Sequence, residues 1–100
     1  MIIPKAVAAS EVLKVHEMIS SRISEKLCID YVDTTLLFRF DIKYDVTIFY
    51  NDGSSKNEAQ ELTSQETFEL EMKNGGIKYV RVNTITVTCT NAGTLEIDYL

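Results

Sequence analysis

The first part of the chain places apolar residues at steps of three and four. This stripe runs through residues 5–27 and consists of Ala8, Val12, Val15, Ile19, Ile23 and Leu27. The spacing predicts one long amphipathic helix with a single apolar face. Pro4 fits the first turn of that helix, where a missing N–H costs nothing, and Ser10 is the alternative as the cap of a later start.

After Leu27 the period changes to two, which is typical of strands with one buried face. The strand-like runs are "LCIDYV", "TLLFRFDIKY", "DVTIFY", the stretch around Phe68, Leu70 and Met72, "KYVRVNTITVTCT" and "TLEIDYL". Asp52-Gly53 and Asn74-Gly75-Gly76 favour turns. The last two runs predict a closing hairpin around Asn91-Ala92-Gly93.

The apolar phase slips inside the longest of these runs. Val80 and Val82 share one parity, whereas Ile85, Val87 and Cys89 share the other. One extra residue near Asn83 and Thr84 would let both sets face the same core, so the slip predicts a β-bulge there. A strand buried on both sides is the alternative.

Residues 53–66 have almost no apolar positions, and we expect them to form a long polar surface loop, with one helical turn as an option. The whole chain, 1–100, reads as a single domain with a helix at about 5–27 and a β-rich part at 28–100. The predicted fold class is α+β: one long N-terminal amphipathic helix packed on an antiparallel sheet of five or six strands. A β-sandwich with an added helix is the alternative. Predicted sheet core residues are Phe38, Phe40, Val46, Ile48, Phe68, Leu70, Ile85, Val87, Leu95 and Ile97.

The composition, 100 residues with 45% hydrophobic and 25% charged residues, is that of a folded globular domain. No apolar run approaches the roughly 20 residues that cross a bilayer, and "MIIPKAVAAS" does not have the basic region followed by an apolar stretch that is expected of an export signal. We therefore expect no membrane partner and a cytoplasmic location, or one within an intracellularly assembled particle. Cys28 and Cys89 are expected to be buried free thiols, with a disulfide as the alternative.

The net charge of −5 is concentrated in the second half, because residues 1–50 carry six bases and seven acids and residues 51–100 carry four bases and eight acids. An acidic domain repels phosphate backbones, so no nucleic-acid partner is expected. Lys73, Lys78 and Arg81 form the one basic cluster, and three charges are too few to change that expectation.

Two surfaces are candidates for contact with a protein. The segment "NTITVTCTN" places Thr84, Thr86, Thr88 and Thr90 on one strand face about 7 Å apart, at twice the strand rise. The solvated side of an amphipathic strand explains this row, and a protein-contact face is the second interpretation. The other candidate is an acidic docking patch made of Glu58, Glu61, Glu66, Glu69 and Glu71, for which a solubilising face is the simpler reading.

Catalytic equipment is not recognisable in the chain. His16 is the only histidine and has no partner fixed by spacing, so a partly exposed helix histidine is expected. Phosphate-binding, nucleophile and metal motifs are absent from the sequence. We therefore predict no enzyme activity, no cofactor and no metal.

These observations favour a non-catalytic protein-interaction or assembly protein, whose partner is either a second copy in a homo-oligomer or a basic protein surface. The Thr-rich strand and the C-terminal strand are expected to be sheet edges that pair with a neighbour. In general style, and without any motif, the chain resembles small β-rich accessory proteins of virus or phage particles. The alternative function is an acidic inhibitor, such as an immunity or anti-defence protein, that blocks a basic site on a partner enzyme.

Overall fold

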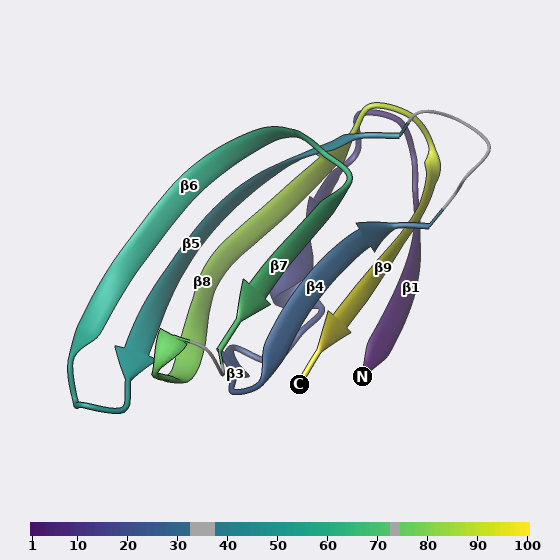
Figure 1. The fold of residues 1–100 in the computed structure, drawn as a ribbon. Coiled ribbons are helices and arrows are strands. Elements are labelled where there is room, and N and C mark those ends of the chain that lie inside the picture. The colour runs from purple at the N-terminus through teal and green to yellow at the C-terminus, as the bar shows by residue number, and fades with distance from the viewer. Residues whose placement is uncertain (33–37, 73–74) are drawn as a thin grey trace.

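The structure is a computed structural model that describes residues 1–32, 38–72 and 75–100. Of the described residues, 69% lie in strands and 4% in helical turns, and none lies in a helix of seven residues or more, so the described chain is almost entirely β. Figure 1 shows the elements. They are β1 (Ile2–Val7), β2 (Val12–Lys14), a 3-10 turn η1 (Val15–Glu17), β3 (Arg22–Ile23), β4 (Lys26–Tyr31), β5 (Phe40–Tyr50), β6 (Ser55–Gln65), β7 (Thr67–Glu71), β8 (Ile77–Cys89) and β9 (Gly93–Tyr99).

The strands form two antiparallel sheets (Figure 1). Sheet A has the order β1-β9-β4-β7, and sheet B has the order β2-β8-β5-β6, with the two-residue β3 also paired to β8. Apart from β3, the eight strands pair first with last, second with seventh, third with sixth and fourth with fifth. One long antiparallel hairpin is thus wrapped over itself, which is the topology of the eight-stranded jelly roll.

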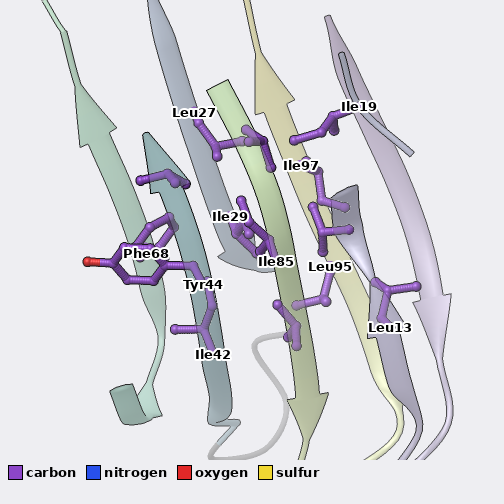
Figure 2. Close-up of a cluster of buried hydrophobic side chains, with 14 of the residues drawn as sticks. Leu13, Ile19, Leu27, Ile29, Ile42, Tyr44, Phe68, Ile85, Leu95 and Ile97 are labelled. Atoms are coloured by element: carbon purple, nitrogen blue, oxygen red, sulfur yellow. The ribbon is translucent and has the colours of Figure 1, made fainter. Parts of the chain in front are cut away.

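The core lies between the two sheets. Figure 2 shows Ile42 and Ile85 of sheet B in one cluster with Ile29, Leu95 and Ile97 of sheet A. Nine of the ten predicted sheet core residues are buried, and Leu70 is half-buried against them. No polar or charged side chain is buried among the described residues, so the space between the sheets is an apolar interior.

The predicted helix over 5–27 is wrong, and so is the α+β fold class. The alternative, a β-sandwich with an added helix, is correct for the two sheets and wrong for the helix. This segment contains β1, β2, η1 and β3. Serines interrupt any helix here: Ser10 has a positive φ of 62°, and the Ser20 hydroxyl accepts a hydrogen bond from the Arg22 N–H at 3.2 Å. Such local bonds compete with helical ones. Pro4 lies in β1, an edge strand that tolerates a missing N–H.

The predicted loop over 53–66 is also wrong, because residues 55–65 form β6, which pairs with β5 along one side only. The predicted closing hairpin is absent as well: β8 lies in sheet B and β9 in sheet A, so residues 90–92 cross between the layers. "LCIDYV" supplies β4 as expected, and the two runs before Asp52 merge into the single strand β5. Leu36, Leu37 and Asn74 lie outside the described residues.

Two local predictions are confirmed. The Asp52-Gly53 turn joins β5 to β6, with Gly53 at a φ of 90° and the Ser54 N–H donating to the Asp52 carboxylate at 2.8 Å. The β-bulge is present in β8, where Asp45 pairs with Thr84 and the next residue of β5 pairs with Val82. Asn83 is therefore the extra residue, and Val80 and Val82 before it face the core together with Ile85, Val87 and Cys89 after it.

Candidate functional site

The threonine row lies on the outer face of sheet B. Thr84, Thr86 and Thr88 alternate with the buried Ile85 and Val87, which agrees with the solvated side of an amphipathic strand. However, β8 lies between β2 and β5, and β9 lies between β1 and β4, so the prediction that these strands are free edges is wrong.

Thr90 lies beyond the end of β8 and is not part of a continuous row. Its hydroxyl and its backbone N–H both donate to the Arg39 carbonyl oxygen, at 3.1 and 3.2 Å. Two shallow hollows, of about 320 and 310 Å³, flank the other three threonines, and Lys43 and Glu61 line both. Lys43 stands directly opposite Glu61 in the strand register, so this part of the face carries both signs of charge.

The five predicted acidic residues do not form one patch. Glu58 and Glu61 lie on β6 in sheet B, whereas Glu69 and Glu71 lie on β7 in sheet A. Glu66 stands at the crossing between the two strands and lies 3.9 Å from the Arg39 guanidinium. The prediction followed chain order, and the chain changes sheets in the middle of it.

A different acidic cluster forms on the outer face of sheet A, where β7, β4 and β9 lie side by side. Its members alternate with buried residues on all three strands and are Asp30, Glu69, Glu71, Glu96 and Asp98, here called the acidic face. Cross-strand register places Asp30 directly opposite Glu96, and places Cys28 between Glu69 and Asp98.

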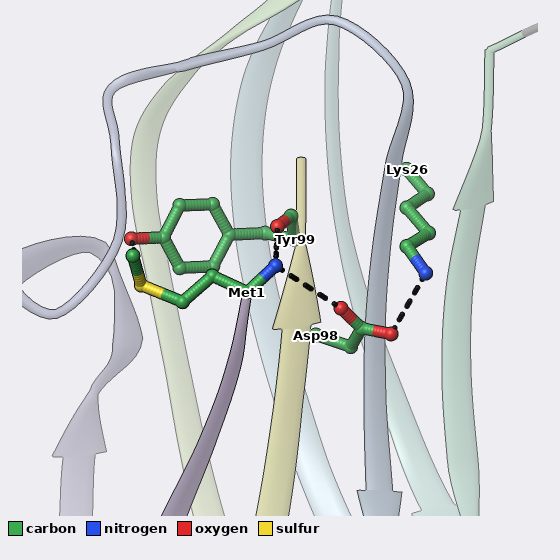
Figure 3. A network of polar contacts seen from close by, with 4 residues as sticks. All are labelled: Met1, Lys26, Asp98 and Tyr99. Atoms are coloured by element: carbon green, nitrogen blue, oxygen red, sulfur yellow. Dashed lines mark hydrogen bonds and ion pairs between the residues drawn. The ribbon is translucent and has the colours of Figure 1, made fainter.

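One end of the acidic face is neutralised by cations (Figure 3). The Lys26 ammonium donates to the Asp98 carboxylate at 2.9 Å, and the Met1 amine lies 3.6 Å from the other oxygen of that carboxylate. The hydrogen bond from Lys26 holds the pKa of the Asp98 carboxyl below its ordinary value. Within the described ranges, no ion pair reaches Asp30, Glu69 or Glu96, so these three carboxylates keep their negative charge.

Cys28 gives the acidic face a chemical reporter. Its side chain is half-buried at the centre of the face, and partial burial together with the Glu69 carboxylate raises the pKa of its thiol. Cys89 lies in the core of sheet B, where burial raises the thiol pKa to about 11. Both cysteines are free. The expectation of free thiols is confirmed, although Cys28 is only partly covered.

The far end of sheet B carries the opposite charge. The Arg22 guanidinium lies 3.9 Å from the centre of the Tyr79 ring, which stacks on Phe49 at 4.7 Å and 18°. Arg81 lies 5.5 Å from the Phe49 ring centre on the same face. We call Arg22, Phe49, Tyr79 and Arg81 the arginine–aromatic patch. Both arginines are exposed, and neither has an ion pair in the part of the chain that the structure describes.

His16 has a structural position rather than a place in either surface. It lies in the 3-10 turn η1, not in a long α-helix, and its Nδ1 is 3.1 Å from the Ile85 backbone nitrogen and 3.1 Å from the Ile85 carbonyl oxygen. These contacts fall between the β2 and β3 pairings of β8, on the side of β8 that faces away from β5. The imidazole thus satisfies backbone that the interrupted sheet edge leaves unpaired.

Sequence reasoning missed Asp30, Glu96, Asp98 and the arginine–aromatic patch. Strand parity contained part of the signal, because acids that alternate with Leu27 and Ile29, or with Leu95 and Ile97, must face outward. The strand order that brings these acids together is non-local. Of the predicted basic cluster, Arg81 joins Arg22 instead, and Lys73 lies outside the described residues. No group of three or more potential metal ligands is present in residues 1–32, 38–72 and 75–100.

Comparison with protein-family models, with curated proteins and with solved structures finds no match. Neither the structure nor these comparisons give evidence for a viral or particle-accessory function, and that expectation is dropped. No helix in the described part of the chain is long and apolar enough to cross a membrane.

Proposed function

We propose that this protein is a non-catalytic protein-interaction domain that binds a basic protein surface through the acidic face. The observation that carries the proposal is the charge distribution on sheet A. Asp30 and Glu96 stand directly opposite each other on neighbouring strands, and Glu69 lies one strand further along, with no ion pair to any of the three within the described residues.

Such an arrangement has an energetic cost that a solubilising surface does not require. Directly opposed like charges destabilise a sheet, whereas spreading the same charges over loops would give equal solubility. A basic partner would relieve this repulsion and would also be steered toward the face over several ångströms. Charge complementarity of this kind mainly raises the association rate and the selectivity for a partner.

The proposal is testable with a cationic peptide as the probe and Cys28 as the local reporter. An arginine-rich peptide should slow the alkylation of Cys28 by iodoacetamide, because it covers the centre of the acidic face, and added salt should remove that protection. A glutamate-rich peptide of the same length is the negative control. Because net charge alone attracts any cation, the site-specific readout is the protection of Cys28 and not binding as such.

Matched variants separate the acidic face from the overall charge. Glu69→Gln with Glu96→Gln should abolish the protection of Cys28 by the peptide, whereas Glu17→Gln with Glu61→Gln removes the same charge from exposed positions elsewhere and should preserve it. Equal protection in both double variants, or no protection in the native protein, would reject the acidic face as the binding surface.

An acidic inhibitor of a basic enzyme site is the second candidate function, and it would use the same acidic face. The two functions differ in their effect on the partner. An inhibitor forms a complex of defined size with one enzyme and lowers the activity of that enzyme. Loss of inhibition in the Glu69→Gln, Glu96→Gln variant would support that function once a target enzyme is in hand.

A further inference from the structure

Charged residues stand directly opposite each other four times in the described strand pairs. Lys26 faces Glu71 and Lys43 faces Glu61, so two of these pairs are of opposite charge. The other two are of like charge: Arg22 faces Arg81 in sheet B, and Asp30 faces Glu96 in sheet A. Each sheet therefore exposes one repulsive pair, and the two pairs have opposite signs.

The two repulsive pairs are complementary in more than charge. The arginine–aromatic patch presents two guanidinium groups above a stacked pair of half-buried rings. Arginine and tyrosine are the residue types that dominate the centres of protein interfaces. Guanidinium groups match carboxylates in a planar, two-point geometry that lysine cannot form. On the other sheet, the acidic face presents the carboxylates of Asp30 and Glu96 beside the small side chain of Cys28.

We propose that the partner of the acidic face is the arginine–aromatic patch of a second copy of this chain. This inference rests on the proposed function, since it names the partner of the same face. Contact would give each guanidinium a carboxylate and would convert two repulsive pairs into one attractive group of four. The acidic face belongs to sheet A and the patch to sheet B, so the two lie on the outer faces of different layers.

This placement fixes the kind of assembly. One copy in contact with another leaves one acidic face and one patch unoccupied, so the interaction is head-to-tail and can close into a ring or continue as an open chain. A two-fold symmetric dimer would need the acidic face and the patch of each copy in one interface. Their positions on the outer faces of different layers exclude such a dimer. Because exposed charges form part of the contact, its strength should fall as ionic strength rises.

The test is sedimentation velocity over a wide concentration range at low and high salt. The native protein should show a mass that rises with concentration and falls with salt. Two double variants, Arg22→Glu with Arg81→Glu and Glu69→Lys with Glu96→Lys, should each remain monomeric. Lys14→Glu with Lys56→Glu is the control, because it makes the same charge change as the arginine variant at exposed positions outside the patch.

Mixing the two double variants gives the decisive result. The arginine variant keeps a native acidic face and the glutamate variant keeps a native patch, so the mixture should associate although neither variant associates alone. A monomeric mixture, or loss of association in the lysine control, would overturn the proposal. Milder Arg22→Gln with Arg81→Gln changes, checked by circular dichroism, provide the same comparison if charge reversal impairs folding.

Failure of this inference is distinguishable from failure of the proposed function. A native protein that stays monomeric at every concentration, while the arginine-rich peptide still protects Cys28, would reject the second copy as partner and leave the acidic face as a docking surface. A monomeric protein with no protection of Cys28 would reject both.

Discussion

The β-bulge in β8 provides the sharpest test of how this fold is encoded. Deletion of Asn83 removes the extra residue and leaves the stretch from Tyr79 to Cys89 with uniform parity. Either Val80 and Val82 on one side, or Ile85, Val87 and Cys89 on the other, must then turn outward. The smaller set is the cheaper one to expose, and its displacement also turns the exposed Arg81 toward the core.

The expected cost follows from burial. Val80 and Val82 are 1% and 7% exposed, and exposing a buried valine costs about 1.5–3 kcal/mol, so two valines cost about 3–6 kcal/mol. A domain of this size has a free energy of unfolding of about 5–15 kcal/mol. The deletion should therefore leave the protein marginally folded or unfolded at room temperature.

The matched control is Asn83→Ala, which keeps the residue count and hence the bulge. It removes only the exposed hydrogen bonds from the Asn83 amide to Asp45 and Thr47, both at 3.2 Å. That loss should cost about 0.5–1.5 kcal/mol, a decrease in Tm of roughly 2–12 °C for about 100 residues. Thermal unfolding followed by circular dichroism measures both variants. A deletion variant as stable as Asn83→Ala would refute the phase argument.

Three further perturbations test other parts of the structure. His16→Ala leaves the part-buried Ile85 backbone without its side-chain partner and should lower the free energy of unfolding by about 1–3 kcal/mol in urea titrations. Gly93→Ala should cost about 1–3 kcal/mol, because a β-carbon there would lie 2.6 Å from Cζ of the Tyr31 ring; relief of this loss by a second change, Tyr31→Ala, would verify the cause. The pKa of Asp98 is lowered on folding, so its stabilising effect is present above the unfolded pKa of about 3.9 and is lost as pH falls through the folded value. The Tm difference between the native protein and Asp98→Asn should therefore shrink below about pH 4, and a constant difference would contradict the assignment.

Strand parity was predictable because it is a local property. Once a segment is a strand, each residue faces the side opposite to its neighbours, so the outward threonines and the buried core residues could be assigned from the sequence. The phase slip at Asn83 was detectable for the same reason. These predictions required no knowledge of which strands are neighbours.

The N-terminal segment was misread because its four-residue spacing has a cause other than a helix. Val15, Ile19, Ile23 and Leu27 are all buried, as a helical stripe would require. They reach the core from η1, a bend, β3 and β4 in turn. The serines between these residues favour bends. The four-residue spacing fits both a helix and this series of short strands, so the spacing alone could not distinguish them.

The strand β6 was missed because its residues do not alternate between apolar and polar, as those of a half-buried strand do. Its inward positions include Lys56 and Gln60, which stand opposite the buried Ile48 and Tyr44 of β5. As the edge of sheet B, β6 has a neighbour on one side only (Figure 1), and most of its residues are exposed. A strand with polar residues on both faces cannot be distinguished from a loop by hydrophobic periodicity, and such charged edges protect a sheet against unwanted pairing.

The jelly-roll topology does not by itself indicate a function, since unrelated functions share such folds. What it does is bring together charges that are distant in the sequence: Asp30 meets Glu96, and Arg22 meets Arg81, only because the hairpin wraps over itself. Each opposed pair is worth about 0.2–1 kcal/mol, so relief of both contributes about 0.4–2 kcal/mol. Because 1.4 kcal/mol is a factor of ten in affinity, this relief changes a Kd by about 2- to 30-fold. The repulsion is therefore small enough for the chain to fold. Any tight association must draw most of its energy from covering the Phe49 and Tyr79 rings. Tyr79→Ala should therefore weaken the association more than substitution of either arginine alone.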